Sequence, residues 1–114
     1  MMAHNKPRRA GARWREGAPA YVLGCFDYGS HEVADRYTVF LEPETHGQYG
    51  WWVPYLSLCE NPEKPWGVSG YAEMTQFQFS AYRYRGGRLE GNRRIRWLGL
   101  PENVRAHIRC RMEG

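Results

Sequence analysis

The stretch RYTVFL, residues 36–41, decides the fold class of this chain. Its odd-numbered residues Tyr37, Val39 and Leu41 share one face of an extended chain, and its even-numbered residues share the other. Because successive side chains of a strand point to opposite faces of a sheet, this alternation predicts a strand with at least one buried face. It is the clearest strand signal in the sequence.

The sequence on both sides of this strand predicts further short strands separated by turns and loops. Pro54 lies inside one of them, and its missing N–H favours an edge position or a bulge there. Residues 42–50 have the composition of a turn, and residues 61–70 that of an irregular loop. The further predicted strands are residues 21–28 (YVLGCFDY), 51–59 (WWVPYLSLC), 77–84 (FQFSAYRY) and 93–98 (RRIRWL).

The last fourteen residues predict a helix. Pro101 and Glu102 suit its first turn, because proline needs no N–H there and a carboxylate complements the positive end of the helix dipole. Val104, Ile108 and Met112 recur every four residues and form an apolar stripe. The sequence therefore predicts an α+β fold, in which a small curved antiparallel sheet of four to five strands carries one C-terminal helix packed on one face.

The chain has the length of one domain, with 114 residues of which 13 are Gly and 7 are Pro. This frequency of chain-breaking residues favours short strands over long helices. Residues 1–19 contain Trp14 as their only large apolar group, so they are expected to form a flexible basic arm. Residues 20–114 are expected to form a single α+β domain.

Cysteine usage and hydropathy favour the cytoplasm and argue against secretion and a membrane span. Cys25, Cys59 and Cys110 are three in number and widely spaced, so they form neither a complete disulfide set nor a C-x-x-C pair. No run approaches the roughly 18 apolar residues that cross a bilayer. Cys25 and Cys59 lie on predicted strands, where a free cysteine usually acts as a small buried apolar residue.

The sequence predicts neither catalysis nor a cofactor, and it identifies no catalytic residue. The four histidines are scattered, which is unfavourable for a metal site. The nearest approach to a hydrolytic or metal cluster is His31 with Glu32 and Asp35, and the alternative for that group is a solvated turn. The chain also lacks a glycine-rich phosphate loop and a G-x-S-x-G elbow.

Charge is strongly segregated along the chain. Residues 1–20 carry a net charge of +4, residues 21–82 one of −6, and residues 83–114 one of +6. Such blocks can offer two surfaces of opposite sign, or they can neutralise each other inside one fold. In the second case, the arginines pair across the sheet with Glu42, Glu44, Glu60 or Glu73.

Basic residues interleaved with aromatic ones near the second basic block predict contact with nucleic acid or a ribonucleoprotein. Two strands joined through Gly86 and Gly87 would form a ribbon on which guanidinium groups hold phosphates and tyrosines stack on bases. The basic arm would add flexible positive charges that contact the phosphates. The candidate nucleic-acid-binding residues are Arg8, Arg9, Arg13, Arg15, Tyr82, Arg83, Tyr84, Arg85, Arg88, Arg93, Arg94 and Arg96.

An alternative function uses the acidic, aromatic middle of the chain to bind a host protein, for example a component of a defence system. Trp51, Tyr55 and Trp66 are the candidate contact residues, since aromatic residues in partly exposed loops are common anchors at protein interfaces. The competing interpretation is that these rings belong to the core.

Several stretches resemble a group of small uncharacterised accessory proteins of bacteriophages and other bacterial mobile elements. The resemblance covers about half of the folded part and lies in the order and spacing of these pieces. It implies an accessory gene on a mobile element, and no biochemical activity comes with it. The basic arm and the residues 74–84 depart from the group's pattern. The matching pieces are residues 35–39 (DRYTV), 55–62 (YLSLCENP), 67–69 (GVS), 94–97 (RIRW) and 100–104 (LPENV).

Overall fold

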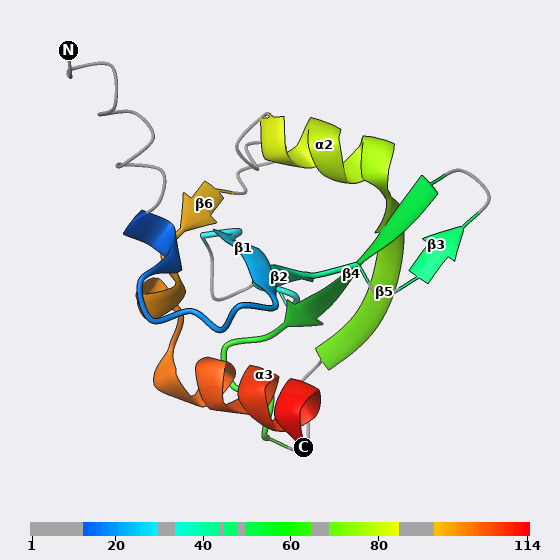
Figure 1. Cartoon of the computed structure of the whole chain (residues 1–114). Helices are drawn as coiled ribbons and strands as arrows, with labels where there is room; N and C mark the ends of the chain where they lie inside the picture. Colours follow the sequence, from blue (N-terminus) through cyan, green and yellow to red (C-terminus); the bar gives the residue numbers. More distant parts are fainter. Residues whose placement is uncertain (1–12, 30–33, 44, 48–49, 65–68, 85–92) are drawn as a thin grey trace, which may run out of the picture.

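A twisted antiparallel sheet forms the middle of the computed structural model, with one helix on each face (Figure 1). The structure describes residues 13–29, 34–43, 45–47, 50–64, 69–84 and 93–114, and of residues 45–47, 50, 69, 83 and 84 it describes the backbone alone. The strands are β1 (Val22–Asp27), β2 (Tyr37–Leu41), β3 (Thr45–Gly47), β4 (Gly50–Leu58), β5 (Ser69–Thr75) and β6 (Arg93–Ile95). The helices are α2 (Gln76–Tyr84) and α3 (Glu102–Glu113), and the 3-10 turns are η2 (Arg13–Arg15) and η4 (Trp97–Gly99).

The described strands make a sheet that is five strands wide. β4 pairs with β2 over residues 55–58 and with β3 over residues 50–52, and it pairs with β5 over residues 52–58. The residues of β4 that pair with β5 include residues that also pair with β2 or with β3. Therefore β5 lies along one edge of β4, and β2 and β3 lie one after the other along the opposite edge. β1 and then β6 continue the sheet beyond β2, and each of these pairings is antiparallel. The predicted α+β class is confirmed.

The strand predicted most clearly behaves as expected. Tyr37, Val39 and Leu41 of β2 are buried in one core cluster, which α3 covers. Phe40 points to the opposite face and belongs to a second cluster under α2. Both faces of the central strands are therefore buried.

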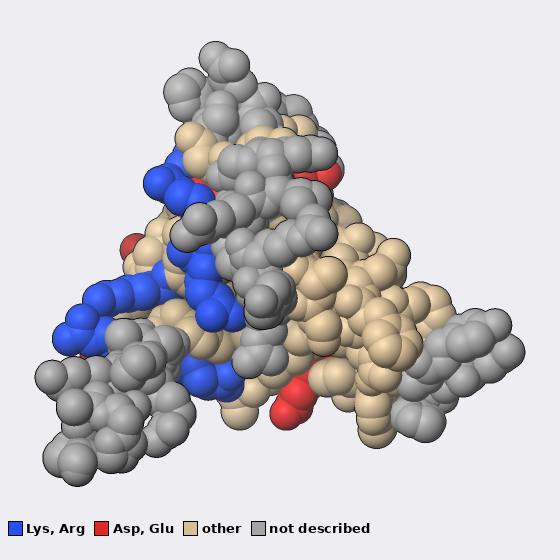
Figure 2. Space-filling view, turned by 90° about the horizontal axis from the view of Figure 1, so that it is seen from above, with Lys and Arg blue, Asp and Glu red and all other residues tan. Residues whose placement is uncertain are grey.

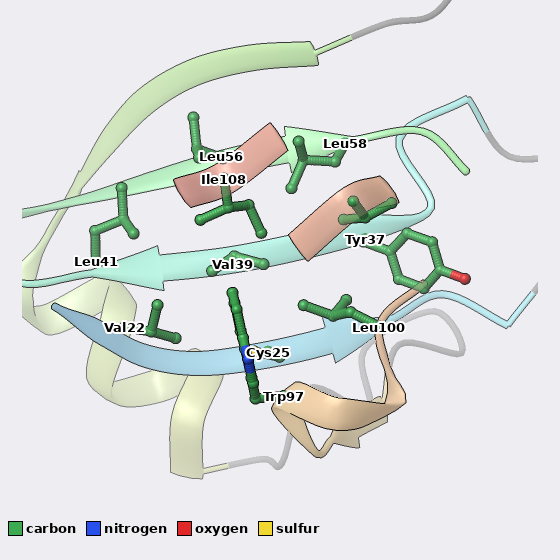
Figure 3. Close-up of a cluster of buried hydrophobic side chains, with 11 residues drawn as sticks. Val22, Cys25, Tyr37, Val39, Leu41, Leu56, Leu58, Trp97, Leu100 and Ile108 are labelled. Carbon is green, nitrogen blue, oxygen red and sulfur yellow. The ribbon is translucent and has the colours of Figure 1, made fainter. Parts of the chain in front are cut away.

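Helix α3 closes the first face as predicted from the stripe of apolar residues. Val104 and Ile108 are fully buried, and Met112 packs against the same cluster. Figure 3 shows Ile108 above the sheet residues Val39 and Leu56. Burying a branched apolar side chain of this size stabilises a fold by about 1.5–3 kcal/mol, so this stripe accounts for the position of α3.

The strand predicted for residues 77–84 is wrong, because these residues form helix α2. Thr75 and Gln78 make a reciprocal capping box: the Gln78 N–H donates to the Thr75 hydroxyl at 3.2 Å, and the Thr75 N–H donates to the Gln78 side-chain oxygen at 3.0 Å. Phe79 and Tyr82, three residues apart, then pack on the second cluster. The sequence signal for this helix was the spacing T-x-x-Q of residues 75–78. The alternation of apolar and polar residues in 77–82 (FQFSAY) favoured a strand instead.

Two strands were missed where the sequence indicated turns and loops. β3 falls within the predicted turn 42–50, and β5 begins inside the predicted loop 61–70. Both contain Gly and polar residues, and their pairing with β4 supplies the order that their local sequence does not. Val53 and Pro54 of β4 lie between the stretches that pair with β2 and β3. On this edge of β4, Pro54 lies where the pairing is interrupted, while on the other edge it pairs with Glu73 of β5. The predicted edge position is wrong, because β4 has partners along both of its edges.

Residues 13–19, the first residues that the structure describes, belong to the folded domain. Trp14 and Ala18 pack against the first core cluster. Gly17 adopts a φ of 77°, and the side chain of Leu98 lies 3.2 Å from where a Cβ would stand. The flexible arm predicted over residues 1–19 therefore does not extend over residues 13–19, because the Trp14 ring provides enough apolar contact to hold them. Residues 1–12 lie outside the described part.

Candidate nucleic-acid interface

Arginines from two distant parts of the sequence meet along one side of the sheet. Figure 2 views the molecule from the α2 side, and the Lys and Arg atoms gather there on the left, where Figure 1 places η2 and β6. The right-hand part, toward the β3–β4 hairpin, carries no blue atoms in this view. We call the arginines of η2, of β6 and of the residue before η4 the arginine edge; its members are Arg13, Arg15, Arg93, Arg94 and Arg96.

The β6 part of the edge projects arginines from both faces of the sheet. β6 pairs with β1, so that Arg93 lies opposite Asp27 and Arg94 opposite Phe26. The guanidinium carbon of Arg94 lies 5.7 Å from the centre of the Phe26 ring, on the α2 side of the sheet. Because neighbouring residues of a strand point in opposite directions, Arg93 leaves the sheet on the α3 side. Both arginines are exposed.

The η2 part of the edge is held by Trp14. The Trp14 ring packs on the core, and the guanidinium carbon of Arg15 lies 4.8 Å from the centre of that ring. The Arg15 guanidinium also donates to the Ala20 carbonyl oxygen at 3.3 Å. Arg13 is exposed on the same turn. η2 contacts η4, and Arg96, which is exposed, lies directly before η4 in extended conformation.

The charges of arginines from both parts of the edge act on the thiol of Cys25. Burial raises the pKa of the Cys25 thiol to about 12, and the positive charges of Arg94 and Arg15 act against this rise. One arginine from each part of the edge therefore lies near the same buried atom. Cys25 is fully buried in the first core cluster and protonated at neutral pH, which agrees with its interpretation as a small apolar residue.

Among the described residues, four members of the arginine edge, Arg13, Arg15, Arg93 and Arg96, form no salt bridge. The recorded salt bridges there join Arg36 to Asp27 at 2.8 Å, Arg36 to Glu60 at 2.9 Å and Arg109 to Glu113 at 3.1 Å. None of them includes Arg13, Arg15, Arg93 or Arg96. Among the described residues, these four arginines therefore form no salt bridge with Glu42, Glu60 or Glu73. Glu44 lies outside the described residues.

Asp27, the carboxylate opposite Arg93, is already engaged by Arg36. Burial alone would raise the pKa of the Asp27 carboxyl, but hydrogen bonds from Arg36 and from the Gly29 N–H outweigh it and hold the pKa below its ordinary value. The charge of Arg93 acts in the same direction. The hydrogen bond to Asp27 is in turn the main reason that the pKa of Arg36 is raised. This carboxylate is therefore charged at neutral pH and shared between two cations.

Tyr82 does not have the position predicted for it. The two-stranded ribbon expected through Gly86 and Gly87 would present this ring to a base, but Tyr82 lies on helix α2 instead. Its ring centre is 4.8 Å from that of Phe26 and 5.0 Å from that of Phe40, both in edge-to-face geometry. The ring is thus part of the second core cluster, and its apolar contacts explain the position.

Several predicted contact residues lie outside the described part of the structure. Arg83 and Tyr84 end helix α2, and only their backbone is described. The residues wholly outside are Arg8, Arg9, Arg85, Arg88 and Trp66.

Two of the aromatic residues predicted to bind a protein, Trp51 and Tyr55, are described, and they have different surroundings. Trp51 is 47% exposed and, with Pro43, lines a shallow hollow of about 190 Å³. Tyr55 packs on Phe40, with their ring centres 5.6 Å apart. Phe77, on the first turn of α2, is 69% exposed and was not identified from the sequence. We call Pro43, Trp51 and Phe77 the aromatic end.

The structure offers no metal site in its described part, where no three His, Cys, Asp or Glu side chains are grouped closely enough to hold an ion. His31 and Glu32 lie outside the described residues, and Asp35 is exposed. Among the described helices, none is long and apolar enough to cross a membrane. Comparison of the chain with protein-family models, curated proteins and solved structures finds no match.

Proposed function

We propose that this protein is a small non-catalytic binding module that contacts nucleic acid, or a ribonucleoprotein, through the arginine edge. The observation that carries the proposal is that η2, β6 and the residue before η4, which together carry five arginines, are neighbours at the β6 end of the sheet. Within the described residues, no salt bridge joins Arg13, Arg15, Arg93 or Arg96 to a carboxylate. A group of cations of this kind attracts a polyanion.

Arginine suits phosphate more closely than a positive charge alone requires. Its planar guanidinium group donates two parallel hydrogen bonds to a phosphate and stays charged at every physiological pH. Each phosphate that is neutralised releases counterions, so affinity falls with salt by about 0.9 logarithmic units per tenfold increase for each contact with B-form DNA. Non-specific binding of this kind typically has a dissociation constant of about 10⁻⁴–10⁻⁶ M at physiological salt.

The test replaces the most exposed members of the edge. The triple variant Arg13→Gln, Arg93→Gln and Arg96→Gln is expected to lose on the order of 100-fold in affinity for a DNA duplex at about 0.1 M salt, because three counterion-releasing contacts are removed. Binding is measured by fluorescence anisotropy, and far-ultraviolet circular dichroism checks that the variant is folded.

The matched control is a pair of single variants that each remove one exposed arginine. Arg96 belongs to the edge, whereas Arg111 lies in the last turn of α3. Arg96→Gln is expected to weaken binding several-fold and Arg111→Gln to leave it within about twofold. Equal losses for the two variants would mean that the net charge of the chain, and not the arginine edge, attracts the nucleic acid.

The aromatic end supports a second candidate function, the binding of a host protein. Trp51 presents about half of its surface beside Pro43, and a partly exposed Trp at a shallow hollow is a common anchor for a protein partner. Affinity for such a partner responds weakly to salt, while binding through the arginine edge responds strongly. A salt titration of any complex that the protein forms therefore distinguishes the two functions.

The proposed setting is the cytoplasm of a bacterium, with the chain encoded by a mobile element. Cys25, Cys59 and Cys110 are all free thiols, which supports a reducing compartment. The origin from a mobile element rests on the resemblance described above. Finding the gene inside a prophage or a plasmid would support this setting, and finding it among conserved chromosomal genes would count against it.

A further inference from the structure

The end of helix α3 binds the chain segment that carries the η2 part of the arginine edge. One guanidinium nitrogen of Arg109 donates to the carbonyl oxygen of Gly17, two residues after Arg15, at 3.4 Å. Another nitrogen of the same group donates to a carboxylate oxygen of Glu113 at 3.1 Å. One side chain of α3 therefore holds both its own helix and the backbone between η2 and β1.

Tyr21 makes a second connection at the same place. Its hydroxyl donates, at 2.6 Å, to the Glu113 carboxylate oxygen that also accepts from Arg109. Burial and this hydrogen bond raise the pKa of Tyr21 to about 12, so the hydroxyl keeps its proton at neutral pH. We call Tyr21, Arg109 and Glu113 the helix clasp. It joins the last turns of α3 to both Gly17 and the residue before β1.

The segment between η2 and β1 has little regular structure of its own. η2 is a single 3-10 turn without a buried residue, and the Ala18 N–H donates to the Arg15 carbonyl oxygen at 2.8 Å. Isolated turns of this length are unstable, so other contacts must fix the directions in which Arg13 and Arg15 point. The Trp14 ring anchors η2 on the core, and the helix clasp anchors the residues that follow.

We propose that Arg109 is a positioning residue of the arginine edge, which fixes Arg13 and Arg15 for nucleic acid by holding the carbonyl group of Gly17. This inference rests on the proposed function and adds to its site a residue that acts through others. A guanidinium group suits this role because its planar fork binds two acceptors in a fixed geometry, whereas the ammonium group of lysine is a point charge on a flexible chain. The alternative is that Arg109, whose side chain is 47% exposed, contacts a phosphate itself.

The first experiment measures the segment without a ligand. Amide hydrogen exchange is followed by NMR at Ala18, in the segment, and at Val39, in the middle of the sheet. In Arg109→Gln, exchange at Ala18 is expected to be at least about fivefold faster, because the segment opens more easily, while exchange at Val39 changes by less than about twofold. The control Arg111→Gln removes a charge from the last turn of α3 and should leave both amides unchanged. Unchanged exchange at Ala18 in Arg109→Gln would overturn the proposal.

The second experiment separates positioning from direct contact. The affinity of Arg109→Gln for a DNA duplex is measured by fluorescence anisotropy, in the wild-type chain and in a chain that already carries Arg13→Gln and Arg15→Gln. Positioning predicts a loss of about fivefold in the first chain and of less than about twofold in the second, where the positioned residues are absent. Equal losses in the two chains would show that Arg109 contacts phosphate itself, and would overturn the proposal.

The conservative variant Arg109→Lys keeps the charge and changes the geometry. It is expected to lose nearly as much duplex affinity as Arg109→Gln, because lysine cannot hold Gly17 and Glu113 in the same arrangement. Affinity equal to that of the wild-type chain would mean that a positive charge at this place is sufficient, which contradicts a positioning role. Thermal unfolding of each variant checks that it is folded at the temperature of the titration.

The outcomes separate this inference from the proposed function. If the wild-type chain binds the duplex and Arg109→Gln binds it equally well, the inference is wrong and the proposed function remains. If the wild-type chain does not bind the duplex at low salt, both are wrong.

Discussion

The arginine edge and the aromatic end are built from the same sheet but in different ways. The aromatic end is local: Trp51 lies in the β3–β4 hairpin, and α2 begins directly after Thr75, which pairs with Trp52. The arginine edge joins residues near position 14 to residues near position 95 through the packing of η2 on η4. The comparison shows how the two basic blocks of the sequence become one surface, because the segments that carry them are neighbours beside β1 and β6.

The largest difference that we expect between the two regions is in how much their tryptophan rings stabilise the fold. Trp14→Ala removes a ring that packs on the core and is expected to lower the free energy of unfolding by about 1–3 kcal/mol. Trp51→Ala removes a ring that is 47% exposed and should cost less than about 1 kcal/mol. Urea denaturation of both variants measures this difference.

The same pair of variants also sharpens the functional comparison. Loss of Trp14 releases η2 and with it Arg13 and Arg15, so duplex affinity should fall even where the variant is fully folded. Trp51→Ala should leave duplex affinity within about twofold, because its ring lies away from the edge. If Trp51→Ala weakened duplex binding as much as Trp14→Ala did, the division of the molecule into two regions would be wrong.

An effect on stability of similar size, with only a slight effect on binding, is expected from the carboxylate beside the edge. Asp27 is 12% exposed as a side chain and accepts two hydrogen bonds from Arg36, so Asp27→Asn should lower the free energy of unfolding by about 1–3 kcal/mol at pH 7. The pKa of Asp27 is below its ordinary value of 3.8 in the folded state. Its stabilisation is therefore complete above that value and is lost as the pH falls through the folded pKa.

Comparison of the wild-type and Asp27→Asn proteins across pH isolates this contribution. The difference in the free energy of unfolding should be largest above about pH 5 and shrink as the pH falls toward 2. A difference that stays constant over this range would mean that Asp27 owes its effect to packing and not to its charge. Duplex affinity of the variant should rise slightly, since the edge then lacks the neighbouring negative charge opposite Arg93.

The smallest effect on binding is expected at Tyr82. A ring that stacks on a base is worth about 1–3 kcal/mol, which corresponds to a loss of roughly 5- to 150-fold on its removal. Because the Tyr82 ring packs on Phe26 and Phe40, Tyr82→Leu should change duplex affinity by less than about twofold once the variant is folded. Its thermal midpoint should fall, since the ring contacts are lost. A tenfold loss of affinity with an unchanged midpoint would restore the predicted stacking role.

The sequence by itself determined the elements whose pattern is local and strong. The alternation in residues 36–41 specified a strand with at least one buried face, and the spacing of Val104, Ile108 and Met112 specified the helix that covers that face. These patterns were sufficient because side chains on one face recur every two residues in a strand and about every 3.6 residues in a helix, so the spacing of the apolar residues identifies the element. The segregation of charge and the absence of a disulfide set were equally readable from the chain.

Only the tertiary structure decided the remaining features. β3 and β5 exist because β4 pairs with them, and α2 exists because Phe79 and Tyr82 are buried on Phe40, although their sequence also alternates like a strand. The arginine edge required the same information, since no local pattern reveals that Arg15 and Arg94 lie near one buried thiol. Contacts between residues eighty positions apart depend on how whole elements pack, and a sequence pattern reports only on its neighbours.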